Sequence, residues 1–120
     1  MKKVIIQIAF QESLLRTRAA MLKLRGYSVL SALRAEGLAA LPESVYHRAG
    51  LFLLGHAATL EERAKLVQQI RQKNPALKIL ALKSTVHASN VPGADATCDL
   101  EDAETWLSKV DEMMGPAPGE

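Results

Sequence analysis

The residues of this chain that could do chemistry stand at the ends of its apolar runs. The run 51–54 leads through a glycine into His56, and the run 79–82 leads into Lys83 and Ser84. His56 could act as a general base at such a position. The sequence places no obvious nucleophile beside His56, so the alternative interpretation is an ordinary loop histidine.

Metal chemistry has little support in the sequence. The three histidines, His47, His56 and His87, are scattered, and Cys98 is the single cysteine. This spacing does not match that of zinc ligands. We therefore expect no metal site, and a lone cysteine forms no internal disulfide, which is typical of a protein from the reducing cytoplasm.

Carboxylates are almost absent from the ends of the apolar runs. The first run, 4–8, leads into Ala9 and Phe10, and only Asp99, after the short run 96–98, carries a carboxylate. A hard cation such as magnesium needs oxygen ligands. The segment 9–13 also lacks the glycines that let backbone approach a pyrophosphate. We expect neither a cofactor nor catalysis by this chain.

Strand-like and helix-like segments alternate along the chain and must position these residues. The apolar patterns predict strands at 3–8, 27–31, 51–54, 78–82 and 96–98, and helices at 11–25, 35–48, 59–73 and 100–114. Pro42 divides the second helix or begins its second part, and Thr59 with Glu62 forms a capping box at the start of the third. This alternation predicts an α/β fold, a doubly wound five-stranded parallel sheet with strand order 2-1-3-4-5.

Length and composition predict one water-soluble domain. The chain has 120 residues, of which 48% are hydrophobic and 23% charged, and a formal net charge of +2. This charge is too small to indicate nucleic-acid binding. Gln7 interrupts the first apolar stretch, so neither export nor membrane insertion is expected. We expect a cytoplasmic protein with a domain at 1–114 and a disordered tail at 115–120.

Residues 3–114 resemble the receiver domains of two-component response regulators, the CheY-like family. The matching segments are 3–6, 22–29, 50–54, 66–71 with the Asn74-Pro75 that follows, and 93–95. Each segment is weak alone, but their order and spacing are typical of the family. The resemblance implies a flavodoxin-like, receiver-like fold and a role in bacterial phosphorelay signal transduction.

The resemblance stops at the positions that carry phosphorylation in receivers. The acidic pair that holds magnesium falls on Ala9 and Phe10, and the phospho-accepting aspartate falls on Gly55. The hydroxyl residue of the fourth strand falls on Lys83, beside Ser84, and no Lys-Pro pair follows the fifth strand. The degenerate pocket that we expect consists of Ala9, Phe10, Gly55, His56, Lys83, Ser84 and Asp99. The resemblance therefore implies a pseudo-receiver that holds no magnesium and has no phosphoacceptor.

Two further departures concern the surroundings of this pocket. Only residues 84–92 separate the fourth strand from Gly93, which predicts a loop or a single turn in place of the full fourth helix of receivers. Lys83 could pair with Asp99 or Asp102 and so fix what phosphorylation normally switches. The alternative is a solvated lysine in a weak surface pair.

The last helix supplies the candidate interface, which consists of Trp106, Val110 and Met113. Val110 belongs to the apolar stripe of this helix, and Trp106 and Met113 lie on its flank. Such a flank is either the edge of the core or a docking surface. The first helix carries a second candidate, a basic set that includes Arg16, Arg18 and Arg25, for which a solvated helix surface is the alternative.

Taken together, the sequence predicts a non-phosphorylatable receiver-like signalling module that binds a protein partner or itself, in the latter case as a homodimer. The competing hypothesis is a small-molecule-binding or enzymatic flavodoxin-like domain that uses Lys83, His56 and Ser84 at the strand ends. A third is a degenerate domain that persists only as a structural unit. Neither nucleic acid nor membrane is an expected partner.

Overall fold

A five-stranded parallel sheet forms the centre of the protein, in the order β2-β1-β3-β4-β5. The computed structural model describes residues 3–56, 58–83, 91–99 and 102–115. The strands are β1 (Val4–Ala9), β2 (Ser28–Leu33), β3 (Ala49–Leu54), β4 (Lys78–Lys83) and β5 (Ala96–Asp99). The predicted strand order 2-1-3-4-5 is confirmed.

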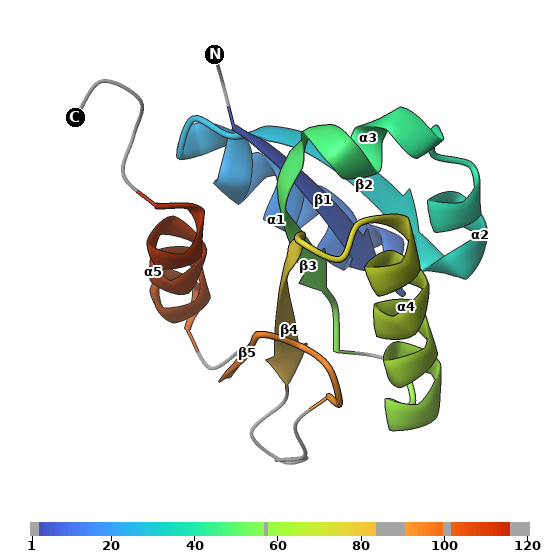
Figure 1. Ribbon diagram of the computed structural model, residues 1–120. Helices are drawn as coiled ribbons and strands as arrows, with labels where there is room; N and C mark the ends of the chain where they lie inside the picture. The colour runs from blue at the N-terminus through green and yellow to red at the C-terminus, as the bar shows by residue number, and fades with distance from the viewer. Residues whose placement is uncertain (1–2, 57, 84–90, 100–101, 116–120) are drawn as a thin grey trace.

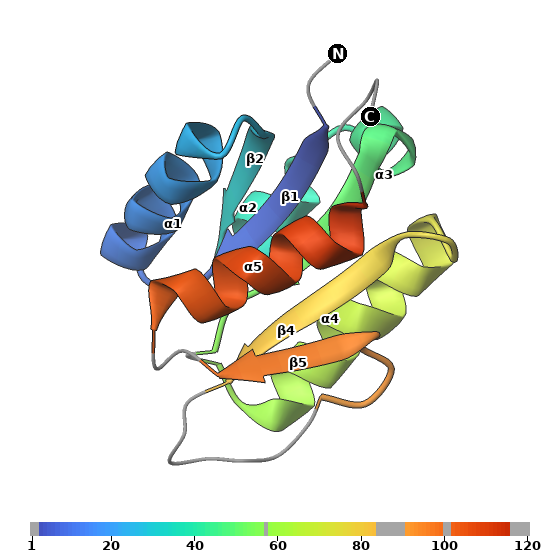
Figure 2. The ribbon, with the colours of Figure 1, turned by 90° about the vertical axis from the view of Figure 1, so that its left-hand side faces the viewer.

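Helices cover both faces of the sheet, as the views in Figures 1 and 2 show. The helices are α1 (Glu12–Leu24), α2 (Arg34–Ala39), α3 (Glu43–Arg48), α4 (Leu60–Lys73) and α5 (Ala103–Met114). Helices α1 and α5 pack on one face, and α2, α3 and α4 pack on the other. The helical segment expected over 35–48 is divided at Pro42 into α2 and α3, and Pro42 lies in extended backbone as the N-cap of α3.

Apolar side chains fill the space on both faces of the central strands. Ile5 and Leu53 pack toward α1 and α5, whereas Ile6 and Phe52 pack toward α2, α3 and α4, and all four are buried. Parallel sheets that are covered on both faces need such continuous apolar strands. This is why the short apolar runs of the sequence identified the strands.

Two helices that follow a strand end directly are important for the site. Helix α1 begins three residues after β1, and α4 begins shortly after β3. The Thr59 hydroxyl accepts a hydrogen bond from the Glu62 amide at 3.1 Å, which confirms the predicted N-cap of α4. The first turns of α1 and α4 therefore stand at the carboxyl edge of the sheet, one on each face.

Two sequence expectations lie outside the described residues. The shortened segment between β4 and β5 falls mostly on residues 84–90, and the predicted disordered tail falls mostly on 116–120. Within the described part of the chain, no helix combines the length and the apolar character needed to cross a membrane.

Candidate functional site

The strand-end residues singled out in the sequence do gather at one edge of the sheet. Ala9, Lys83 and Asp99 are the last residues of β1, β4 and β5, and Gly55 directly follows β3. The Gly55 amide donates to the Ile8 carbonyl at 2.9 Å, which ties this position to β1. Ser84, the remaining member of the predicted pocket besides Phe10 and His56, lies outside the described residues.

Gly55 leaves no room for a side chain. A Cβ atom at this position would lie 2.9 Å from the Ile8 carbonyl oxygen, 3.3 Å from the Ala9 Cα and 3.2 Å from the Arg18 Nη1. Two of these neighbours are backbone atoms of β1, which the sheet holds in place. The glycine is therefore required by a close approach of β1 and by the guanidinium of Arg18.

Arg18 reaches this point from α1, and only 5% of its surface is exposed. Its Nη2 lies 3.2 Å from the His56 Nδ1. A guanidinium only donates hydrogen bonds, so this contact requires a neutral His56 that carries its proton on Nε2. The expectation that Arg18 belongs to a solvated or partner-binding helix surface is wrong, because the side chain turns into the core.

Arg63 reaches the same edge from α4 on the opposite face, and it too is only 5% exposed. Its Nη2 donates to the Leu82 carbonyl near the end of β4. Burial lowers the pKa of both Arg18 and Arg63. The pKa of His56 is lowered by burial and then by repulsion from the two guanidinium groups.

Within the described part of the chain, neither buried arginine is neutralised by a carboxylate. The Nη1 of Arg18 and the Nε of Arg63 have no hydrogen-bond partner, and among the described residues no carboxylate forms an ion pair with either side chain. The described residues also contain no group of three or more histidine, cysteine, aspartate or glutamate side chains that could hold a metal ion. The site therefore presents two cations and a neutral imidazole, which is an environment for an anion.

Lys83 selects one of the two partners that the sequence allowed. Its Nζ lies 3.9 Å from the Asp99 Oδ1, and the two residues face each other across β4 and β5. A pair with this long separation and an Asp99 side chain 45% exposed contributes about 0–1 kcal/mol. The Lys83–Asp99 pair thus contributes little to the stability of this edge of the sheet.

The Phe10 side chain packs on the α2, α3 and α4 side of the sheet, whereas Gly55 contacts Arg18 of α1, although both belong to the predicted pocket. The half-buried Phe10 ring packs on the cluster beneath α2, α3 and α4, beside Leu66. The space near Gly55 is taken by Arg18. Of the seven predicted residues, Ala9, Gly55 and His56 therefore meet at the arginine pair, and Phe10 does not contribute to it.

Sequence reasoning missed the two arginines, although a signal was present. Arg63 lies three, four and seven residues before Leu66, Val67 and Ile70, in the buried stripe of α4. Arg18 likewise stands four residues before the buried Leu22 of α1. A charged residue within the apolar stripe of a helix must either snorkel to solvent or meet polar groups inside.

The candidate interface on α5 is only partly exposed. Trp106 is 3% exposed and Val110 is fully buried, and both pack on the sheet in the cluster of α1 and α5. Met113 is half-buried at the edge of this cluster. For Trp106 and Val110 the structure favours the core-edge interpretation, so a docking surface on α5 would have to use its outer flank.

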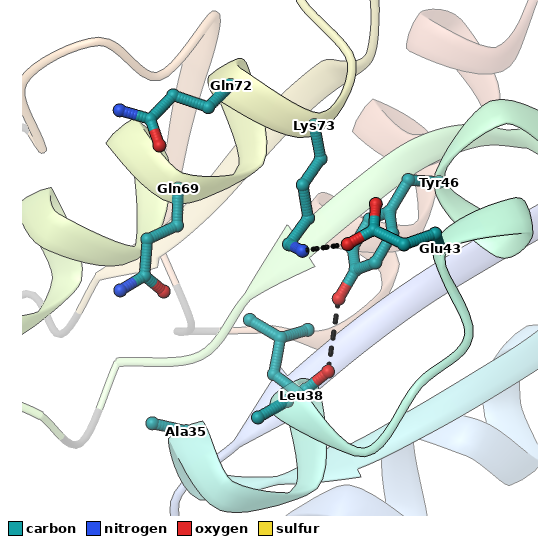
Figure 3. A pocket seen from close by; sticks show the side chains of 8 residues that line it. Ala35, Leu38, Glu43, Tyr46, Gln69, Gln72 and Lys73 are labelled. Carbon is teal, nitrogen blue, oxygen red and sulfur yellow. Dashed lines mark hydrogen bonds and ion pairs between the residues drawn. The ribbon is translucent and has the colours of Figure 1, made fainter.

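A pocket away from the strand ends lies between α2, α3 and α4, and Figure 3 shows the side chains that line it. Its volume is about 570 Å³. The Lys73 Nζ lies 2.6 Å from the Glu43 Oε1, and the Tyr46 hydroxyl donates to the Leu38 carbonyl at 3.1 Å. Lys73 and Glu43 pair with each other and the Tyr46 hydroxyl has a backbone acceptor, so the pocket offers less chemistry than the two buried arginines do.

Comparison with known proteins places the fold but not a sequence family. No protein-family model matches the chain, and no curated protein sequence matches it. A CheY-like receiver domain protein from Methanospirillum hungatei superimposes with a TM-score of 0.76 at 22% identity, over 95% of this chain and 94% of that one. A receiver domain protein from Clostridium thermocellum gives 0.77 at 12% identity, over 93% and 94%.

The response regulator TrrA from Thermotoga maritima, solved with magnesium and a beryllium fluoride, is also similar. It gives a TM-score of 0.73 at 16% identity, over 96% of this chain and 100% of that one. The same regulator was solved in complex with the histidine kinase ThkA. With its five-stranded parallel sheet in the order 2-1-3-4-5, this chain therefore has the CheY-like, flavodoxin-like fold of receiver domains.

Proposed function

We propose that this protein is a receiver-like signalling module that is not phosphorylated and that acts by binding a protein partner. The observation that carries the proposal is the contact between Gly55 and Arg18. The position that follows β3 can hold no side chain, and a guanidinium lies where that side chain would extend. This packing supports the absence of an acceptor carboxylate at this position.

The donor groups at the site also do not fit the magnesium chemistry of receivers. Phosphoryl transfer to a protein needs a nucleophile and a cation that neutralises the phosphoryl oxygens. Magnesium is held by oxygen ligands, whereas Arg18, Arg63 and His56 offer nitrogen groups, two of them positively charged. The two guanidiniums would repel a divalent cation at this edge.

The receiver fold supports a protein partner and a setting in cytoplasmic, bacterial two-component signalling. TrrA, which shares the fold, was solved in complex with a histidine kinase. For this chain we place the contact on the outer flank of α5, next to the half-buried Met113, with the buried Trp106 and Val110 supporting it from beneath. Self-association through the same flank is the second form of this interaction.

The first experiment tests the absence of phosphorylation. The full chain is incubated with Mg²⁺ and acetyl phosphate, and its intact mass is measured beside that of a phosphorylatable receiver domain. We expect the control to gain one phosphoryl group and this chain to keep its mass. A phosphoryl group on any aspartate of this chain would overturn the proposal.

The second experiment tests the partner surface. The full chain is used to capture purified histidine kinases, and its self-association is measured by analytical ultracentrifugation. We expect Met113→Glu to abolish the complex or the dimer, because it places a charge at the edge of the apolar flank. Thr105→Glu, on an exposed position of the same helix, is the matched control. Equal effects of the two substitutions would contradict an interface at Met113.

One observation favours the second candidate function, a small-molecule site at the strand ends. His56 is in contact with an arginine that still has an unpartnered N–H group. Of the three residues first expected to serve such a site, Lys83 pairs with Asp99, His56 contacts Arg18, and Ser84 lies outside the described residues. A small-molecule site would therefore depend on the arginines.

A further inference from the structure

We propose that Arg18, Arg63 and His56 form a binding site for a small organic oxyanion, such as a carboxylate or a phosphate ester. The charged group of the ligand would bind at the arginines, and its apolar part would lie in the cavity between α1 and α5. This site goes beyond the proposed signalling role and does not depend on it, because the arginine pair stands whether or not a protein partner binds.

The first support is the state of the two arginines. Each is 5% exposed, and each keeps an N–H group without a partner, at the Arg18 Nη1 and the Arg63 Nε. A buried charge is costly unless it is paired and hydrogen-bonded. An oxyanion that accepts from these groups would remove that cost, and the guanidinium fork matches the geometry of carboxylate and phosphate oxygens.

The second support is convergence. Arg18 comes from α1 on one face of the sheet, and Arg63 comes from α4 on the other. Both act electrostatically on His56, in the loop that joins β3 to α4. The two arginine side chains, each in the buried stripe of its helix, thus reach the same edge of the sheet. In this class of fold, ligands bind at the carboxyl edge of the parallel sheet.

The third support is the path to solvent. His56 is half-buried, more open than either arginine, and its Nδ1 covers the Arg18 Nη2. A small rotation of the imidazole would uncover the guanidinium. The negative charge of a ligand would also favour the protonated imidazole, which then has two N–H donors and no longer competes for Arg18.

The fourth support is a cavity that adjoins both Arg18 and His56. It has a volume of about 340 Å³ and lies between α1 and α5. Leu14 and Met21 of α1 and Trp106 of α5 supply apolar walls. Cavities of this size, mostly apolar with a few polar groups at one side, are typical of small-molecule sites. The combination fits a ligand with one anionic group and an apolar body.

The experiment is titration calorimetry on the full chain with four probes at matched ionic strength: benzoate, phenyl phosphate, acetate and benzyl alcohol. We expect benzoate or phenyl phosphate to bind, and the better of the two to bind at least about tenfold more tightly than acetate, because a buried ring adds apolar contact. Benzyl alcohol, which lacks the charge, should not bind. Absence of binding by both aromatic anions would overturn the proposal, and so would equal binding of benzyl alcohol.

Variants locate the site within the chain. Arg18→Met should reduce the affinity for the bound aromatic anion at least about tenfold, since it removes one charged fork. Arg16→Met, on an exposed arginine of the same helix, should leave the affinity unchanged. Should Arg18→Met fail to fold, Arg63→Met and Arg18→Lys provide the same comparison. Equal affinities across the Arg18, Arg63 and Arg16 variants would place the anion elsewhere and overturn the proposal.

The pH dependence supplies a readout that a purely structural role would not move. His56 faces Arg18 from α1 and Arg63 from α4, and both suppress its protonation in the free protein. We expect affinity to rise as the pH falls, because a bound anion counteracts the burial and the guanidinium repulsion that lower the pKa of His56 and so favours the imidazolium. His56→Gln should flatten this dependence. A pH profile that is identical in the wild type and in His56→Gln would contradict the role of His56.

Discussion

Arginines at the amino edge of the sheet are paired with carboxylates, whereas arginines at the carboxyl edge are not paired with any carboxylate of the described residues. At the amino edge, Arg25 donates to Asp111 and to Glu104, each at 2.6 Å, and Arg71 donates to Asp95 at 2.7 Å. At the carboxyl edge, Arg18 and Arg63 are more deeply buried, yet no carboxylate of the described residues pairs with them.

This difference indicates that the amino-edge arginines stabilise the fold and that the carboxyl-edge arginines have another role. Arg71 also donates to the carbonyls of Leu77 and Gly93, so it fastens the end of α4 to β4 and to the approach of β5. Arg18 and Arg63 make single contacts to an imidazole and a carbonyl. Proteins tolerate unsatisfied charges mainly at functional sites, where a ligand completes the hydrogen bonding. The contrast indicates that the amino edge stabilises the fold, and it supports the anion site that we propose at the carboxyl edge.

The largest expected effect on the free energy of unfolding comes from adding a Cβ atom at Gly55, at the carboxyl edge. In Gly55→Ala the new Cβ would lie 2.9 Å from the Ile8 carbonyl oxygen, so β1 or β3 must shift. We expect a loss of about 2–3 kcal/mol in the free energy of unfolding, measured by urea denaturation. Gly50→Ala, where the closest atoms belong to the Met114 side chain, is the control and should cost less. Equal costs would contradict the close approach of the strands.

Breaking the paired arginine of the amino edge comes next. Arg71→Met removes the partner of Asp95 and leaves the Leu77 carbonyl without its donor. We expect a loss of about 2 kcal/mol in the free energy of unfolding, measured by chemical denaturation. A change of less than about 0.5 kcal/mol would show that this arginine is as dispensable as one on the surface.

The Arg71–Asp95 pair should lose its stabilising contribution at low pH. Burial alone would raise the pKa of Asp95, but the Arg71 guanidinium and the Ile79 amide bond to its carboxylate and lower the pKa overall. A carboxyl whose folded pKa is lowered stabilises the fold above its unfolded pKa of about 3.9, and this contribution disappears as the pH falls through the folded pKa. Asp95→Asn should therefore weaken the dependence of stability on pH in the acid range.

Removing an arginine from the carboxyl edge should cost less than removing one from the amino edge. Arg18→Met keeps the apolar stem and deletes an unpaired buried charge, an exchange that is often neutral or stabilising. We expect the free energy of unfolding to change by less than about 1 kcal/mol or to increase. A loss equal to that of Arg71→Met, in the same denaturation assay, would abolish the contrast between the two edges.

His56 makes the carboxyl edge sensitive to pH near neutrality. Its folded pKa lies below the unfolded value of about 6.5, so the unfolded chain binds more protons in the interval between the two. Stability without ligand should therefore fall as the pH drops below about 6.5. The measurement is the urea midpoint against pH. His47→Gln, an exposed histidine, should retain this slope, and His56→Gln should lose it.

The smallest effect is expected at the Lys83–Asp99 pair. Its atoms are 3.9 Å apart, and Asp99 is half exposed. Lys83→Gln should change the free energy of unfolding by less than about 0.5 kcal/mol, as determined by thermal and urea denaturation. A loss above about 1 kcal/mol would instead support the hypothesis that this pair locks the sheet edge.

Much of the fold could be predicted because each strand carries its own local signal. The apolar runs around Ile5, Phe52 and Leu80 identify strands that are buried on both faces, and their alternation with helices leaves few possible topologies. The candidate site could be predicted only in part. The strand-end positions of Gly55 and His56 follow from the order of elements. Whether Phe10 joins the site depends on the face of the sheet on which its ring packs, and the sequence does not specify that face.

By itself, the sequence determined the five-stranded order and the residue types at the strand ends, because both follow from positions that local patterns locate. The tertiary structure alone decided that Arg18 and Arg63, 45 residues apart in the chain, meet at one edge. A helical stripe shows which side of a helix is buried, but not what lies opposite it. Only the packing of α1 and α4 on opposite faces of the sheet brings the two cations to the same strand ends, where no carboxylate of the described residues pairs with them.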